Sequence, residues 1–214
     1  GVYTQEEDGY GLRPNIGMRG SGLERSAKIN MMEDGIPIAP APYSSPAAYY
    51  SPTAGRMESF EIRKGSSQIK YGPHSTGGAI NYISASIPEK LKFQGTVSTG
   101  SFGTSLGKFK TGVSSKNYGI MFQTYLDKTD GFKSIDGGDE TGFIKNDYLF
   151  KARLKTKREF AAAELKISQT NEVSNETYLG LIRSDFAKDP FRRYRASQKD
   201  QMSADHNQIF LTGA

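Results

Sequence analysis

The sequence predicts a mainly β protein in two parts: a small α+β segment, residues 1–88, and a series of long antiparallel strands, residues 89–214. Three observations support this division. The 214 residues include 24 glycines, 12 tyrosines and 12 phenylalanines, which favours glycine-punctuated strands over helices. Eight of the nine prolines lie in the first 88 residues. Beyond residue 91, apolar and polar residues alternate in long runs, with the period of a β-strand.

The first segment reads as short strands separated by turns. Residues 28–33, the pair Asp34-Gly35 and residues 36–38 predict a hairpin, because Asp-Gly supplies the positive backbone angles of a type I′ turn. Alternation predicts two further strands, at 59–64 and 79–84. Residues 39–52 contain four prolines and three tyrosines, which excludes a helix. This loop either faces a ligand or packs on its own scaffold.

The second segment alternates over runs of about ten residues, the length of a membrane-spanning barrel strand. In the clearest run, Tyr148, Phe150, Ala152 and Leu154 point one way, and Lys151, Arg153, Lys155 and Lys157 point the other. Short connectors at 115–117 and 157–159 contrast with long ones at 128–143 and 171–201, as in outer-membrane barrels. A basic residue facing lipid would cost about 2–4 kcal/mol, so the basic side would face a wet interior. A soluble β-sandwich would show the same local alternation, and this alternative stays open.

Little in the sequence supports enzymatic chemistry. Cysteine is absent, which excludes disulfides and thiolate sites. His74 and His206 are far apart in sequence, so neither a metal site nor a histidine-based triad is expected. The spacing of Gly17, Gly20 and Gly22 is not a dinucleotide fingerprint. The sequence contains no apolar run of about 18 residues, so no membrane-spanning helix is predicted. We expect no enzyme, no permanently bound cofactor and no metal site, and we expect the chain to be an internal piece of a longer protein.

Several motifs together resemble TonB-dependent outer-membrane receptors, and are most similar to the ferric dicitrate receptor branch. They are PNIGMRG at 14–20, MEDGIPIAPAPYSSP at 32–46, the glycine-rich stretch ESFEIRKGSSQIKYGPHSTGGAINYIS at 58–84, NETYLGL at 175–181 and DPFRRYRASQKDQM at 189–202. The resemblance implies a plug domain over residues 1–88, with its N-terminal part missing. Residues 89–214 would then be about the first six strands of a 22-stranded transmembrane antiparallel β-barrel in the outer membrane of a Gram-negative bacterium.

The resemblance implies high-affinity uptake of an iron chelate, ferric citrate-like or another siderophore. The implied partners are TonB with its inner-membrane energising complex, the ferric chelate as transported ligand and outer-membrane lipid, but no nucleic acid. The implied ligand-binding residues are Asp8, Tyr10, Tyr43, Ser44, Ser45, Arg183, Arg192, Arg193 and Arg195. Ser45 departs from the branch, which has a ligand-contacting glutamine there. Arg19 and Lys64 match basic plug positions that pair with acidic groups on the barrel wall, in a gating or structural role.

Three other interpretations remain open at this point. The barrel could be a passive structural or adhesive protein, or its ligand could be a compound without iron, such as cobalamin or a sugar. The basic stretch at 189–195 could also be an ordinary solvated surface loop.

Overall fold

The computed structural model describes residues 1–6, 8–38, 50–65, 76–155 and 162–213. The chain divides into two compact units, Gly1–Ser86 and Ile87–Ala214. The boundary expected from the sequence, after Pro88, lies two residues further along. Among the described residues, no helix combines the length and apolar character needed to cross a membrane.

The first unit contains two small sheets. Its elements are β1 (Val2–Gln5), β2 (Asn15–Met18), η1 (Glu24–Ser26), β3 (Ile29–Glu33), β4 (Ile36–Pro37), η4 (Ala54–Arg56), β5 (Met57–Arg63) and β6 (Gly78–Ser84). Strands β1 and β2 form an antiparallel pair. The second sheet has the order β4-β3-β6-β5, in which β3 and β6 are parallel and the other neighbours antiparallel. The predicted strands at 59–64 and 79–84 are confirmed as β5 and β6.

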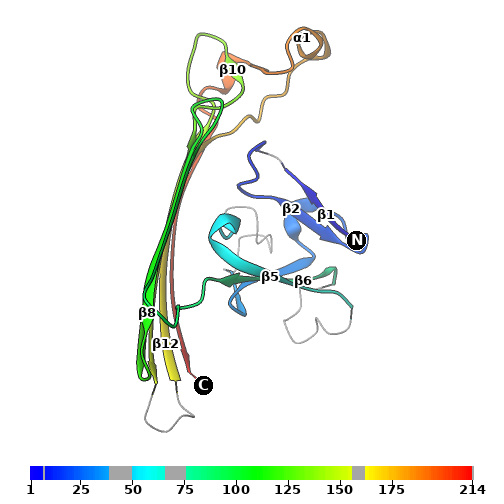
Figure 1. The fold of residues 1–214 in the computed structure, drawn as a ribbon. Helices are drawn as coiled ribbons and strands as arrows, with labels where there is room; N and C mark the ends of the chain where they lie inside the picture. Colours follow the sequence, from blue (N-terminus) through cyan, green and yellow to red (C-terminus); the bar gives the residue numbers. More distant parts are fainter. Residues whose placement is uncertain (7, 39–49, 66–75, 156–161, 214) are drawn as a thin grey trace. The chain divides into compact units, whose positions relative to one another are not determined.

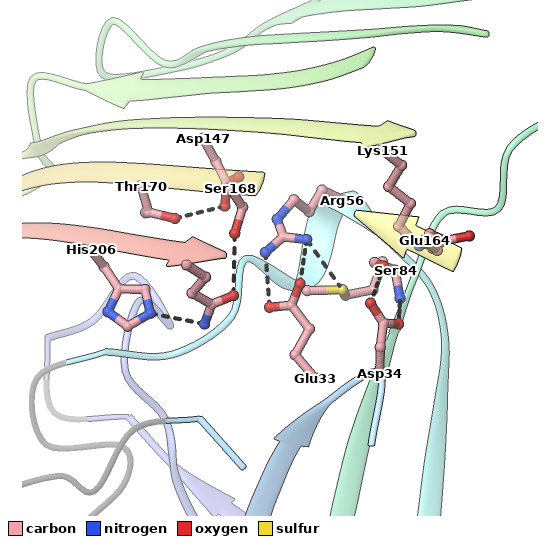
Figure 2. Close-up of polar contacts among 12 residues, drawn as sticks. Glu33, Asp34, Arg56, Ser84, Asp147, Lys151, Glu164, Ser168, Thr170 and His206 are labelled. Carbon is pink, nitrogen blue, oxygen red and sulfur yellow. Dashed lines mark hydrogen bonds and ion pairs between the residues drawn. The ribbon is translucent and has the colours of Figure 1, made fainter. Parts of the chain in front are cut away.

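The predicted hairpin is also confirmed, as β3, a two-residue turn and β4. Asp34 and Gly35 have φ values of 51° and 81°, the positive angles that the turn requires. The turn is fastened to β6. The Asp34 carboxylate accepts hydrogen bonds from the backbone N–H and the hydroxyl of Ser84, at 2.8 and 2.5 Å (Figure 2). Asn81 Oδ1 accepts a further one from Gly35 N–H at 2.8 Å.

The core of this unit is apolar and rich in methionine. Its buried members are Ile16, Met18, Ile29, Met31, Ile38, Tyr50, Ile80 and Tyr82. The glycine pair Gly77-Gly78, at the start of β6, is part of this packing. An ideal Cβ on Gly77 would lie 2.5 Å from the Ser21 hydroxyl, and one on Gly78 would lie 2.4 Å from the Met18 sulfur. Close approach of neighbouring side chains therefore requires glycine at both positions.

The second unit is built on one antiparallel sheet. Its elements are β7 (Lys92–Thr99), β8 (Ser105–Ser114), β9 (Tyr118–Thr129), β10 (Ser134–Ile135), β11 (Phe143–Lys155), β12 (Ala162–Asn175), α1 (Arg183–Lys188), β13 (Arg192–Arg193), η6 (Arg195–Ser197) and β14 (Gln201–Gly213). Six long strands lie side by side in the order β14-β12-β11-β9-β8-β7 (Figure 1). The six predicted alternating runs are thus present, and the tight connector at 115–117 is confirmed.

Two strand boundaries differ from the sequence prediction. β11 begins at Phe143, five residues before the predicted run, and β12 continues to Asn175, into the predicted long connector. The reason is that the alternation of apolar and polar residues continues on both strands. Exposed Ile144 lies opposite Val173 on one face of the sheet, here called outward, and buried Lys145 lies opposite Glu172 on the other face, here called inward. The connector predicted at 157–159 lies outside the described residues.

One face of the sheet is apolar and exposed. Leu154 is 67% exposed and Val97 83%, whereas Lys145 is 4% exposed and Asp147 fully buried. The register places the exposed large apolar side chains on the same face: Phe93, Val97, Phe109, Tyr118, Ile120, Phe122, Leu126, Ile144, Tyr148, Phe150, Leu154, Ile167, Val173, Ile209 and Leu211. A soluble sandwich would bury this face against a second sheet. Among the described residues, no second sheet covers this face.

Candidate ligand-binding loops

Two long loops meet at one end of the six-stranded sheet. Residues 130–142, here the first loop, follow β9, and residues 176–200, the second loop, follow β12. Because β9 and β12 run in the same direction, both loops leave the same end of the sheet (Figure 1). They are joined by a short parallel pairing of β10 with β13. Ser134 N–H donates to Phe191 C=O and Asp136 N–H to Arg193 C=O, both at 2.9 Å.

Arg192 bridges the two loops through its side chain. Its Nε and Nη2 donate to the two carboxylate oxygens of Asp136, in the first loop, at 2.9 and 3.0 Å. Its Nη1 donates at 3.0 Å to Asp185, in α1 of the second loop. The guanidinium also lies 5.0 Å from the ring centroid of Tyr194. This bidentate geometry gives the contact a defined direction as well as charge attraction.

Arg193, next in sequence, points into its own loop. It is 1% exposed, and its guanidinium donates to the hydroxyl of Ser197 at 2.8 Å, to the carbonyl of Ser197 and to that of Asp200 at 3.2 Å. Its side chain therefore closes the turn around η6.

Further contacts connect the two loops. Gln198 donates to Asp139 at 2.6 Å, and the rings of Phe132 and Phe191 pack edge to face with centroids 6.0 Å apart. The guanidinium of Arg195 lies over Gly137, where an ideal Cβ would come within 2.1 Å of Nη1. Gly137 has φ of 93°, so both its conformation and this neighbour favour glycine.

Several ionisable side chains of the two loops have shifted pKa values. Hydrogen bonding to Arg192 lowers the pKa of Asp136, and the same contact raises the pKa of the guanidinium. Hydrogen bonding to Asp185 raises the pKa of Tyr194. Burial lowers the pKa of Lys133, and the nearby charge of Arg193 adds to the effect. The shifts of Asp136, Arg192 and Tyr194 favour the protonation states that their hydrogen bonds use at neutral pH, whereas the shift of Lys133 disfavours its charged form.

The other arginines expected to bind ligand have different surroundings. Arg183, at the start of α1, and Arg195, in η6, are exposed. Neither guanidinium has an ion pair or hydrogen bond to the part of the chain that the structure describes. Of the four arginines singled out from the sequence, these two have side chains open to a ligand.

In the first unit, Asp8 organises its own loop. Its carboxylate accepts hydrogen bonds from the backbone N–H groups of Tyr10 at 2.6 Å, Leu12 at 3.2 Å and Arg13 at 3.2 Å. Tyr10 is partly exposed on this loop. Asp8 therefore fixes the shape of the loop between β1 and β2.

Arg19 and Lys64 both lie exposed on the first unit, where Arg19 has an unusual φ of 55°. Their pairing with a barrel wall stays a prediction. Tyr43, Ser44, Ser45 and His74 lie outside the described residues, so their expected roles also stay predictions.

The inward face of the sheet carries paired polar groups. Lys145 and Glu172, directly opposite on β11 and β12, are both nearly buried and lie 3.0 Å apart. Thr170 donates to Asp147 at 3.1 Å, and Ser168 to Gln208 at 3.2 Å (Figure 2). Among the described residues, no group of three or more histidines or carboxylates is arranged to hold a metal ion.

Comparison with known proteins identifies the first unit. The family model of the TonB-dependent receptor plug domain matches residues 1–79. Residues 1–79 are therefore similar to a TonB-dependent receptor plug domain. The plug domain and the antiparallel sheet together have the fold of receptors in which such a domain accompanies a β-barrel.

Three solved structures illustrate this likeness. The ferric citrate transporter FecA in its unliganded form is 20% identical, with a TM-score of 0.73 over 90% of this chain and 30% of that chain. The ferric yersiniabactin uptake receptor FyuA from Yersinia pestis is 16% identical, with a TM-score of 0.67 over 84% of this chain and 29% of that chain. The copper transporter OprC is 16% identical, with a TM-score of 0.65 over 84% and 27%. The chain thus spans about 30% of the length of the structures it resembles, and at these identities the likeness concerns the fold.

Proposed function

We propose that this chain is the plug domain and first six barrel strands of a TonB-dependent outer-membrane receptor that imports an iron chelate. The observation that carries the proposal is the combination of a plug domain at residues 1–79 with a sheet whose apolar face is exposed. Residues 1–88 would form the plug and residues 89–214 the barrel wall.

The polarity of the sheet supports a membrane location. Monomeric soluble proteins rarely expose a continuous apolar patch larger than a few hundred Å². Here outward Phe122, Phe150 and Ile167 lie directly opposite one another on three neighbouring strands. Charged groups such as Lys145 and Glu172 occupy the other face. This arrangement suits a wall with lipid on one side and a polar interior on the other.

The argument for an anionic ligand comes from two exposed arginines in the loops, and not from the net charge of the loops. Together they carry seven Lys and Arg against eight Asp and Glu, so they have no excess of positive charge. Several of these carboxylates are already engaged, as Asp136 is with Arg192. Exposed Arg183 and Arg195 remain able to form charge-assisted hydrogen bonds with carboxylate or phenolate oxygens of a chelate.

The solved relatives guide the choice of ligand. FecA is a ferric citrate transporter and FyuA a ferric yersiniabactin uptake receptor, which supports an iron chelate as ligand. OprC is a copper transporter, so the shared fold alone does not select iron. The arginines are therefore proposed to contact the organic part of the chelate, and TonB is proposed to supply the energy for release.

The test is radiolabelled uptake by cells that express the full-length receptor. Ferric citrate and a panel of siderophores, copper complexes and cobalamin are offered, with the proton gradient intact or collapsed by an ionophore, and in cells with and without TonB. We expect uptake of one ferric chelate that requires both the gradient and TonB. The double variant Arg183→Ala/Arg195→Ala should lower uptake, and Lys188→Ala, which removes a charge from the same loop, should not.

The other outcomes discriminate between the alternatives. Entry that ignores TonB and the gradient would indicate a passive barrel. Energy-dependent uptake of cobalamin or copper alone would keep the receptor and overturn the iron chelate.

A further inference from the structure

Arg192 already donates three of its five N–H groups to two carboxylates. Its guanidinium already donates to both oxygens of Asp136 and to Asp185. A carboxylate bound at Arg192 would approach these two existing negative charges, and this repulsion disfavours Arg192 as the site that binds an anion. In this respect Arg192 differs from exposed Arg195, three residues further along.

The contacts of Arg192 continue into both loops. Asp185 accepts a second hydrogen bond, from the Tyr194 hydroxyl at 2.7 Å, and that hydroxyl accepts one from Ile182 N–H at 3.2 Å. The second loop is thus braced from the start of α1 to the end of β13. Arg192 then ties this braced loop to Asp136 of the first loop.

The position of Arg195 depends on the same junction. Its guanidinium lies over Gly137, which directly follows Asp136. The Arg192 side chain and the backbone pairing of β10 with β13 hold Asp136 in place. The next residue, Gly137, is the surface on which the Arg195 guanidinium rests, here called the seat of Arg195. A shift of one loop relative to the other would therefore move Arg195 off its seat.

We propose that Arg192 is a clamp between the two loops and does not itself bind the ligand. Together with Asp136, Asp185 and Tyr194 it is a positioning group that holds Arg195 where the anionic chelate binds. The inference rests on the proposed function for its ligand, whereas the clamp itself concerns only the loops. Preorganisation of this kind lowers the ordering cost of binding.

Two measurements on the full-length receptor test this proposal. Arg192→Lys keeps the charge but loses the bidentate fork, and Lys188→Ala is the control in the same loop. Hydrogen–deuterium exchange follows the backbone N–H groups of Ser134 and Asp136, which donate across the β10–β13 pairing. Binding of the chelate that wild type takes up is measured by titration.

We expect Arg192→Lys to speed exchange at both amides about tenfold and to weaken chelate binding about tenfold, as for loss of one hydrogen bond to a charged group. Exchange in β11 and β12 should not change, and Lys188→Ala should match wild type in both assays. Asp136→Asn should reproduce both effects, because it removes the partner and leaves Arg192 in place.

Weaker binding with unchanged exchange would overturn the proposal, since Arg192 would then contact the ligand directly. Faster exchange with unchanged binding would also overturn it, because the clamp would not position Arg195. A wild-type receptor that takes up no chelate would overturn the proposed function, and the exchange measurement would still decide whether the clamp exists.

Discussion

Glu33 and Arg56 form a fully buried ion pair inside the plug domain. The side chains are 0% and 1% exposed, and two N···O contacts of 2.9 Å join them (Figure 2). Replacing Glu33 by Gln keeps the shape of the side chain but removes the negative charge that faces the buried Arg56 guanidinium. Breaking a buried pair in this way costs about 3–5 kcal/mol, which is a large share of a stability of about 5–15 kcal/mol.

The assay is native-state hydrogen exchange of the full-length receptor. Asp34 N–H, bonded to Tyr82 C=O at 2.9 Å, reports on the sheet beside Glu33. At about 1.4 kcal/mol per tenfold change, Glu33→Gln should speed its exchange by about two to three and a half orders of magnitude. The double variant Glu33→Met/Arg56→Met removes both charges and should recover most of the loss.

Glu61→Gln is the matched control for this experiment. It breaks the pair with Arg63 in the same sheet, where both side chains are 38% exposed. Screening by water limits such a pair to about 1 kcal/mol, so exchange should rise by about fivefold at most. Equal effects of Glu33→Gln and Glu61→Gln would refute the reasoning, as would a double variant that exchanges faster than Glu33→Gln.

Three further predictions follow from the second unit. Gly137→Ala should weaken chelate binding about tenfold relative to Gly138→Ala, measured by titration, because both positions have positive φ but only a Cβ at 137 meets Arg195; equal affinities would count against the seat. Phe150→Lys should destabilise the folded receptor by about 2–4 kcal/mol in chemical unfolding, and Phe150→Leu should not; similar losses would place this face away from lipid. The hydrogen bond to Arg192 lowers the pKa of Asp136 below its usual 3.8. The stability that ionised Asp136 gives to the joined loops is therefore fully present above pH 3.8, and it is lost as the pH falls through the lowered pKa. Exchange of the loop amides, corrected for intrinsic rates, should therefore be constant between about pH 5 and 8; a change in that range would require another titrating group.

The strands could be predicted because their signal is local. Alternation in residues 148–155 depends only on neighbouring residues, and Asp-Gly determines the β3–β4 turn within two residues. The ends of β11 and β12 were placed too far from the loops because the outward residues there, Ile144 and Val173, are separated by polar ones such as Asn146 and Asn171. Their regular pairing becomes visible only when the two strands are aligned.

The roles of the loop arginines could not be predicted in the same way. Arg192 and its partner Asp136 are 56 residues apart in sequence. Their contact depends on two strands ending at the same edge of the sheet, which no short motif encodes. Arg192 and Arg193 are adjacent and chemically identical, yet one bridges the loops and the other is buried in its own loop. The local sequence of the first loop likewise contains no motif that marks Asp136 as the partner of an arginine.

The two faces of the sheet differ in the surroundings in which they are stable. In water, exposed Val97, Phe150 and Leu154 would favour association with another apolar surface. In hydrocarbon the same side chains are stable, and the strands must then satisfy their backbone groups by pairing with neighbours, as the antiparallel register does over 13 residue pairs between β11 and β12. The nearly buried Lys145–Glu172 pair is compatible with either solvent because each charge has its partner directly across the strands. The apolar face, and not the charged one, is therefore the feature that supports the proposed membrane location.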